Sequence, residues 1–184
     1  MRILILFATI EGHTRKIVEH ISSMLKEAGH EVRMINATSE QTVPTADEFD
    51  ASIVAAPVHI GTFPAPMRRL VKANAESLMA RPGAFVSVSL AAASSDESEI
   101  AEVAKYVEEF SKETAWWPVS MHHAAGALKY TEYDFFRRWM LKRIVGKDGG
   151  PTDTSQDYEF TDWDALDRFV NNFVEQAPTV AGKI

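Results

Sequence analysis

A short, continuously apolar segment at residues 3–7 constrains the fold of this chain more than any other feature. Such a segment is typical of a central strand in a parallel sheet whose two faces are both covered. Apolar residues then recur at helical spacing from Ile17 to Ala28, and Gly29 is expected to end that helix. A buried strand that leads within a few residues into an amphipathic helix indicates an α/β protein.

The rest of the chain continues this alternation of strands and helices. Further strands are predicted at residues 31–35, 51–56, 84–88 and 119–125, and further helices near residues 67–71 and at residues 97–113 and 162–175. This order predicts one domain, residues 1–184, with a doubly wound sheet of five parallel strands in the order 2-1-3-4-5. In such a sheet ligands bind at the carboxyl ends of the strands, where the loops after the first, third and fourth strands converge.

The turn between the first strand and the first helix predicts a phosphate site. Thr9 and Thr14 supply hydroxyls, and Gly12 permits a close approach of the backbone. The first helical turn adds N–H donors and a partial positive charge, so a monophosphate can bind there without a dedicated lysine. The alternative is that both threonines only cap the helix.

Composition and motifs exclude several classes of protein. The turn lacks the Gly-Lys-Ser/Thr ending of nucleoside-triphosphate loops and the three spaced glycines of dinucleotide loops. The chain has no cysteine, which excludes disulfides and thiolate catalysis, so any redox chemistry requires a bound organic cofactor. A formal charge of −7 argues against a nucleic-acid partner. We expect a cytoplasmic protein, because no apolar run approaches the roughly 20 residues of a membrane span and no secretory signal is evident.

The phosphate loop at residues 9–14 and the predicted strand order resemble the flavodoxin superfamily, in which the first loop holds the phosphate of FMN and the next two loops enclose its ring. The resemblance implies FMN as the cofactor and makes the protein a flavin-dependent oxidoreductase. The contacts that it predicts are Thr9, Ile10, Glu11, Gly12, His13 and Thr14 in the first loop, Val58, His59, Ile60 and Gly61 in the second, and Ser89, Leu90, Ala91 and Ala92 in the third.

The second half of the chain is similar to the menaquinone-dependent protoporphyrinogen IX dehydrogenases. Three patterns carry this resemblance: Gly-Ala-Leu-Lys-Tyr at residues 126–130, Gly-Gly-Pro-Thr-Asp-Thr at 149–154, and Tyr-Glu-Phe-Thr-Asp-Trp at 158–163. It implies a long helical insertion at the fifth strand, about residues 129–157, the substrate protoporphyrinogen IX, and transfer of electrons to a quinone. The Thr-x-acidic-Gly-x-Thr pattern of the first loop also fits, and we expect Glu11 to point away from the phosphate, with Arg15 and Lys16 offsetting its charge.

One departure from that family concerns the substrate. The stretch after the third loop is acidic here, with Asp96, Glu97, Glu99 and Glu102, whereas a basic stretch is typical of these enzymes. If that stretch contacts the propionates of the tetrapyrrole, the resemblance does not fix the identity of the substrate.

The inserted segment is basic and aromatic. Residues 129–148 contain six basic and three acidic residues, and an apolar stripe that includes Trp139 is flanked by cations. Such a helix either frames a pocket for an acidic aromatic ligand or lies on anionic lipid at the cytoplasmic face of the inner membrane, or its stripe packs onto the domain's own core. The residues predicted to contact substrate or membrane are Arg137, Arg138, Trp139, Lys142 and Arg143.

Two pairs of adjacent residues are expected to be structural, and three other functions are alternatives to this hypothesis. His122 and His123 are adjacent on a predicted strand and point to opposite faces, so they are expected to be structural and no metal site is predicted. Trp116 and Trp117 are expected to be packing residues. The alternative functions are a flavodoxin-like electron carrier with an acidic docking surface, an NAD(P)H-dependent quinone reductase, and a flavin-free scaffold; the oligomeric state stays open.

Overall fold

The computed structural model describes residues 1–39, 42–89, 91–93, 97–128 and 158–181. The predicted insertion at 129–157, with all five of its substrate or membrane residues, therefore lies outside the described residues, as do Leu90 and Asp96. No helix in the described ranges is both long enough and apolar enough to cross a membrane.

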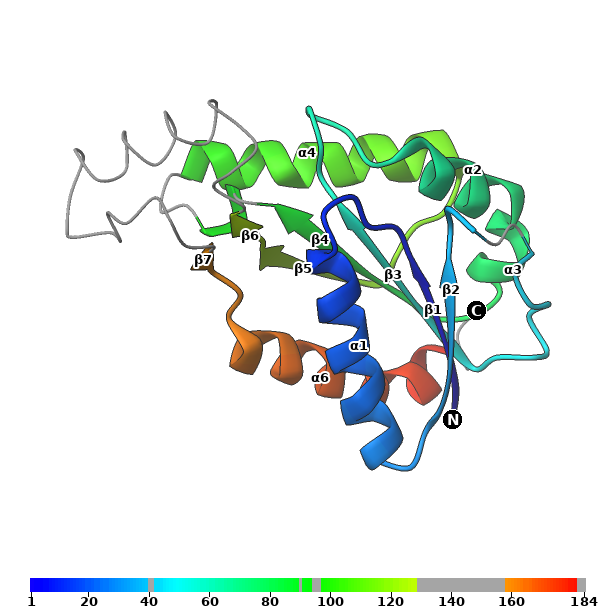
Figure 1. Ribbon diagram of the computed structural model, residues 1–184. Coiled ribbons are helices and arrows are strands. Elements are labelled where there is room, and N and C mark those ends of the chain that lie inside the picture. Colours follow the sequence, from blue (N-terminus) through cyan, green and yellow to red (C-terminus); the bar gives the residue numbers. More distant parts are fainter. Residues whose placement is uncertain (40–41, 90, 94–96, 129–157, 182–184) are drawn as a thin grey trace, which may run out of the picture.

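A parallel sheet of five strands forms the centre of the molecule (Figure 1). The strand order is β2-β1-β3-β4-β5, which confirms the predicted topology. Continuous apolar segments account for the buried positions of β1, β3 and β4, since the central strands of such a sheet are covered on both faces. The strands are β1 (Arg2–Phe7), β2 (Glu31–Asn36), β3 (Ala51–Pro57), β4 (Gly83–Ser89) and β5 (Ser120–Ala125).

Helices cover the two faces of the sheet. Side chains on one face of β1, such as Ile3 and Ile5, pack against helices α1 (His13–Glu27) and α6 (Trp163–Ala181). Side chains on the other face, such as Leu4 and Leu6, belong to a second core with helices α2 (Ala65–Ala73), α3 (Ala75–Met79) and α4 (Glu97–Thr114). Successive side chains of a strand point to opposite faces of the sheet, which produces this separation into two cores.

An aromatic cluster holds α4 against the sheet. Phe85 of β4 stacks with Phe110 of α4, with ring centroids 5.0 Å apart, and Trp116 meets Phe85 edge-on at 6.0 Å. Trp116 is fully buried, as predicted. The same prediction is wrong for Trp117, whose side chain is 49% exposed. The two tryptophans directly follow Ala115, which has a φ of 57°.

Three short elements were not predicted. Helix α3 follows α2 directly, and a single 3₁₀ turn, Ala91–Ala93, follows β4. The third is a small antiparallel pair, β6 (Ala127–Leu128) with β7 (Tyr158–Glu159). Leu128 and Tyr158, the described residues on either side of the segment 129–157, are thus paired with each other.

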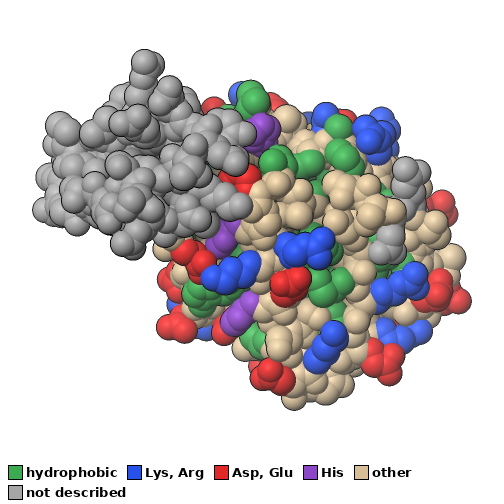
Figure 2. Space-filling model, in the orientation of Figure 1, with side chains coloured by type: hydrophobic (Ala, Val, Ile, Leu, Met, Phe, Trp, Pro, Cys, Tyr) green, Lys and Arg blue, Asp and Glu red, His purple; other side chains and the backbone are tan. Residues whose placement is uncertain are grey.

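Charged side chains are interspersed on the face of the molecule that Figure 2 draws. Lysine and arginine alternate there with aspartate and glutamate over the described residues, with apolar side chains between them. This described face therefore carries both signs of charge.

Candidate functional site

The loop between β1 and α1 leaves helical N–H groups without helical partners. Gly12 is the N-terminal cap of α1, with a φ of 92°, and no side chain caps the helix. The first helical hydrogen bond runs from the N–H of Lys16 to the carbonyl of Gly12, at 3.1 Å. The N–H groups of His13, Thr14 and Arg15 precede it and are available to an anion.

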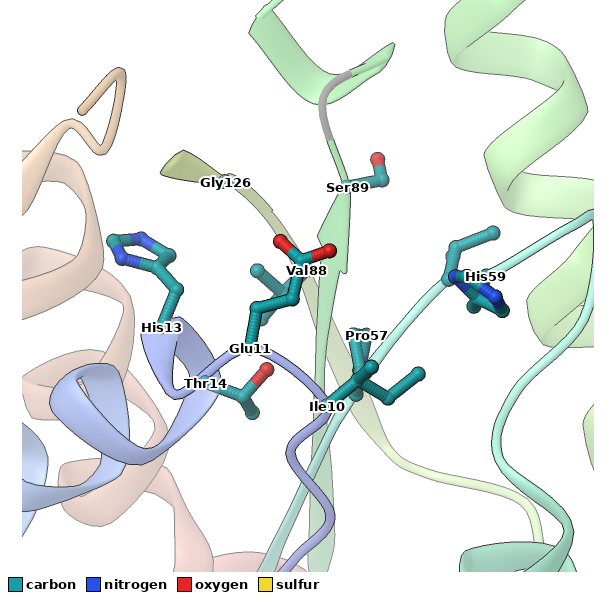
Figure 3. Close-up of a pocket in the computed structure, with 10 residues that line it drawn as sticks. Ile10, Glu11, His13, Thr14, Pro57, His59, Val88, Ser89 and Gly126 are labelled. Atoms are coloured by element: carbon teal, nitrogen blue, oxygen red, sulfur yellow. The ribbon is translucent and has the colours of Figure 1, made fainter. Parts of the chain in front are cut away.

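The two threonines of this loop have different positions. The hydroxyl oxygen of Thr9 accepts a hydrogen bond from the N–H of Gly12 at 3.0 Å, which leaves its own proton to donate. Thr14 lies in the first helical turn, and its hydroxyl is directed toward the pocket (Figure 3). Since neither hydroxyl caps α1, the alternative that these residues serve only as caps is not supported.

A pocket opens at the carboxyl ends of β1, β3 and β4. Its walls come from the three loops that the topology brings together, with Gly126 after β5 closing one side (Figure 3). Seven predicted site residues line it: Ile10, Glu11, His13, Thr14, Val58, His59 and Ser89. Pro57, Val88 and Gly126 also line it and were missed, although their places at or just after strand ends were a usable signal.

The prediction that Glu11 points away from the site is wrong. Its carboxylate is directed into the space between the loops (Figure 3), and the residue is part of the pocket wall. Neither of the two cations expected to offset Glu11 pairs with it. The Nη1 of Arg15 lies 3.8 Å from the Oε1 of Glu19, and the Nζ of Lys16 is paired with the carboxylate of Glu159. The pocket therefore carries a carboxylate beside the expected anion site.

The second loop is a tight turn that exposes an apolar side chain. His59 and Thr62 exchange backbone hydrogen bonds of 2.8 and 3.2 Å across it. Ile60 and Gly61 at the tip have φ values of 48° and 71°, and Ile60 is 89% exposed. A β-branched residue rarely adopts positive φ, and backbone strain of this kind is concentrated at functional sites.

Hydrogen bonds connect the third loop to the end of β5. The N–H of Ala92 donates to the hydroxyl oxygen of Ser89 at 3.2 Å, and the N–H of Gly126 donates to the Ser89 carbonyl at 3.0 Å. Ala91 and Ala92 belong to the 3₁₀ turn, and of these two Ala92 lines a second hollow.

His13 links the phosphate loop to the segment before α6. Its Nε2 lies 2.8 Å from the hydroxyl of Thr161, which donates its only proton to the carbonyl of Ala125 at 2.7 Å. Nε2 must therefore carry the proton of the imidazole. Burial lowers the pKa of His13, against an opposing effect of the carboxylate of Glu159. The imidazole is thus held neutral in a fixed orientation at the edge of the pocket.

Further contacts along α1 reinforce this link. The indole N–H of Trp163 donates to Glu159 at 2.8 Å, and Glu159 is also the partner of Lys16. One turn later, His20 and Asp167 are 2.7 Å apart. The helix that begins at the phosphate loop is therefore attached to the chain on the C-terminal side of residues 129–157.

The two adjacent histidines of β5 have separate contacts. The Nδ1 of His123 lies 2.6 Å from the hydroxyl of buried Ser87, and His122 stacks on Phe169 at a centroid distance of 5.1 Å. They face opposite sides of the sheet, as predicted. Among the described residues no group of three or more His, Asp or Glu side chains is arranged to hold a metal ion.

Comparison with known proteins gives two sets of relatives. A family model described as a flavodoxin domain matches residues 4–155. Protoporphyrinogen IX dehydrogenase (quinone) from Escherichia coli strain K12 is 32% identical over 169 residues, which is 92% of each chain. The protein of the same name from Leishmania major is 32% identical over 171 residues, 92% of this chain and 73% of that one.

Solved structures support the fold. A short-chain flavodoxin associated with a bacterial microcompartment superposes with a TM-score of 0.57 at 13% identity, covering 96% of this chain and 99% of that one. Flavodoxin 1 of Bacillus cereus gives a TM-score of 0.54 at 16% identity, over 95% and 98% of the two chains. The chain therefore belongs to the flavodoxin domain family and, within it, to the protoporphyrinogen IX dehydrogenase (quinone) proteins.

Proposed function

We propose that the protein is an FMN-dependent enzyme that oxidises protoporphyrinogen IX to protoporphyrin IX and passes the electrons to a quinone. The observation that carries the proposal is the pocket between the three loops, which opens at the N-terminus of α1. Two relatives that match 92% of the chain, and that are named for this activity, supply the substrate and the acceptor.

The first loop has the groups that the phosphate of FMN needs. Uncapped N–H groups of the first turn of α1 and the hydroxyls of Thr9 and Thr14 are suited to its oxygens, and Gly12 lets the backbone come close. No lysine or arginine lines this pocket among its described residues, so hydrogen bonds and the helix dipole would provide most of the attraction.

Apart from His59, the second and third loops present apolar groups rather than acids and bases. Val58, the exposed Ile60 and the 3₁₀ turn at Ala91 and Ala92 are the groups suited to flank a planar ring. The hydrogen bonds within the tip of the second loop hold its backbone in place before any ligand arrives. FMN, when bound, supplies the two-electron chemistry that the side chains of a protein without cysteine lack.

The role of the chain is then to bind, orient and exclude water. Conversion of the porphyrinogen to the porphyrin removes six electrons and six hydrogen atoms, so three two-electron oxidations occur and three quinones become hydroquinones. His13 is a positioning residue in this scheme, because its neutral imidazole connects the phosphate loop to Thr161.

The inserted segment is proposed to bring the substrate or the membrane to this site. Its cationic and aromatic residues Arg137, Arg138, Trp139, Lys142 and Arg143 would contact propionates or anionic headgroups, which makes the protein a cytoplasmic enzyme with peripheral membrane contact. The double variant R138E/K142E tests this role. It should lower both quinone-linked activity and sedimentation with anionic vesicles, and unchanged values of both would refute it.

The proposal as a whole is tested on purified protein. Reconstitution with FMN should give a bound-flavin absorption spectrum, and anaerobic addition of protoporphyrinogen IX and a soluble naphthoquinone should give porphyrin fluorescence. Bound flavin without porphyrin would instead favour an electron carrier, and oxidation of NAD(P)H by the isolated protein would favour a quinone reductase.

A further inference from the structure

A second hollow adjoins the cofactor pocket at the edge of the described sheet. It has a volume of about 460 Å³, which lies within the usual range for small-molecule sites. Connected residues line the two spaces: Ser89 and Gly126 line the first, and the second is lined by Ala125, which precedes Gly126, and by Ala92, whose N–H donates to Ser89. A ligand in the hollow would therefore lie next to the third loop of the cofactor pocket.

The hollow combines small apolar walls with two oriented imidazoles. Ala92, Ala125 and Ala165 leave room for a flat molecule, and Phe160 adds an apolar contact. His123 is held by Ser87 at 2.6 Å, and His122 is held by its stacking on Phe169. Burial lowers the pKa of both histidines, so each is a neutral ring that can donate one N–H.

The charge of the hollow discriminates between the two reactants. Its described lining contains one carboxylate, Asp162, and neither lysine nor arginine. Within the described lining, Asp162 would repel the two propionates that a porphyrinogen carries. A quinone is flat and uncharged and has two carbonyl oxygens that accept hydrogen bonds, which matches a slot with alanine walls and imidazole donors.

We propose that this hollow binds the ring of the quinone acceptor, with His122, which lies on the α6 side of the sheet, as the hydrogen-bond donor to one of its carbonyl oxygens. The proposal rests on the proposed function for the identity of the acceptor. Each turnover of the site takes up two electrons from the reduced cofactor in the adjoining pocket and two protons, and the quinone leaves as hydroquinone. The two hydrogen atoms lost by the substrate in each oxidation balance this uptake.

The first test is quinone binding to the oxidised, FMN-loaded protein. Ala165→Trp fills the hollow from α6, and Asn171→Trp places the same side chain on an exposed position of the same helix as the matched control. Calorimetric titration with 2-methyl-1,4-naphthoquinone should give a Kd that is at least tenfold higher in A165W and within twofold of the native value in N171W. An unchanged Kd in A165W would overturn the proposal.

A second variant keeps the test sound if A165W does not fold. His122→Phe retains a flat ring against Phe169 but removes both nitrogens, and loss of one hydrogen bond should raise the Kd roughly 2- to 10-fold. An unchanged Kd in H122F, with A165W either unfolded or unaffected, would likewise refute the site.

Rapid kinetics separate this proposal from the proposed function. In A165W, quinone should reoxidise the photoreduced flavin more slowly, while reduction of the flavin by protoporphyrinogen should keep its native rate. If the native protein does not oxidise protoporphyrinogen but shows the predicted pattern of quinone binding, the proposed substrate is wrong and the site stands. If A165W slows only reduction by protoporphyrinogen, the hollow belongs to the tetrapyrrole and the proposal fails.

Discussion

Removal of one hydroxyl from the first turn of α1 is expected to weaken FMN binding without destabilising the fold. Thr14 is 2% exposed and lines the pocket, and Thr14→Val retains the shape of the side chain. A hydrogen bond to a charged phosphate is worth about 1.5–3 kcal/mol. Its loss should therefore raise the Kd for FMN roughly 10- to 150-fold.

The same helix offers a matched control. Ser22 is 3% exposed, and its hydroxyl has no hydrogen-bond partner within the described structure. Ser22→Ala removes an unsatisfied buried hydroxyl two turns away from the pocket, so it should raise the free energy of unfolding by about 1 kcal/mol. For a domain of this size that corresponds to an increase in Tm of roughly 2–4 °C.

Two measurements distinguish the variants. Quenching of FMN fluorescence on titration with apoprotein gives the Kd, and urea unfolding of the apoprotein gives the stability. T14V should change the first quantity and S22A the second. If T14V binds FMN within twofold of the native affinity, the phosphate is not held at the first turn of α1 and the reasoning is refuted.

Three further predictions follow from particular contacts. Gly83→Ala should lower the free energy of unfolding by about 1–3 kcal/mol, because the Cβ of the new alanine would lie 2.7 Å from the ring of fully buried Trp116. Urea titration measures this loss, and an unchanged unfolding midpoint would contradict the packing of Trp116 against Gly83. Glu11→Gln should lower the Kd for FMN roughly 3- to 10-fold at low salt and less at high salt, since a carboxylate in the pocket repels the phosphate, and a higher Kd would contradict this. Burial lowers the pKa of His13 below 6.5, so the contribution of its neutral form to stability is complete above that pH and is lost as the pH falls through the lowered pKa. As the pH is lowered, the free energy of unfolding of the apoprotein should therefore fall less steeply in H13Q than in the native chain. Parallel curves of stability against pH would refute this role of His13.

The sheet and the phosphate loop could be predicted because their signals are local. The apolar segments of β1, β3 and β4 identify central strands without reference to other parts of the chain. The strand order then follows from the few ways in which alternating strands and helices pack. Thr14 was found in the same way, since its place after the first strand is visible in a window of a dozen residues.

The contents of the pocket were harder to predict because they depend on backbone geometry and distant contacts. The direction of Glu11 is set by a turn in which Gly12 has a positive φ, and no pattern of residue types encodes that direction. The bond between His13 and Thr161 joins residues 148 positions apart. Residue type likewise cannot tell buried Trp116 from its neighbour Trp117, which is 49% exposed.

The central claim is tested most directly by the stoichiometry of anaerobic turnover. FMN-loaded protein is mixed with protoporphyrinogen IX and 2-methyl-1,4-naphthoquinone, and porphyrin fluorescence and hydroquinone are measured together against a control without protein. The account predicts enzyme-dependent protoporphyrin with three hydroquinones for each porphyrin. Bound FMN with porphyrin formation no faster than in the control would contradict it.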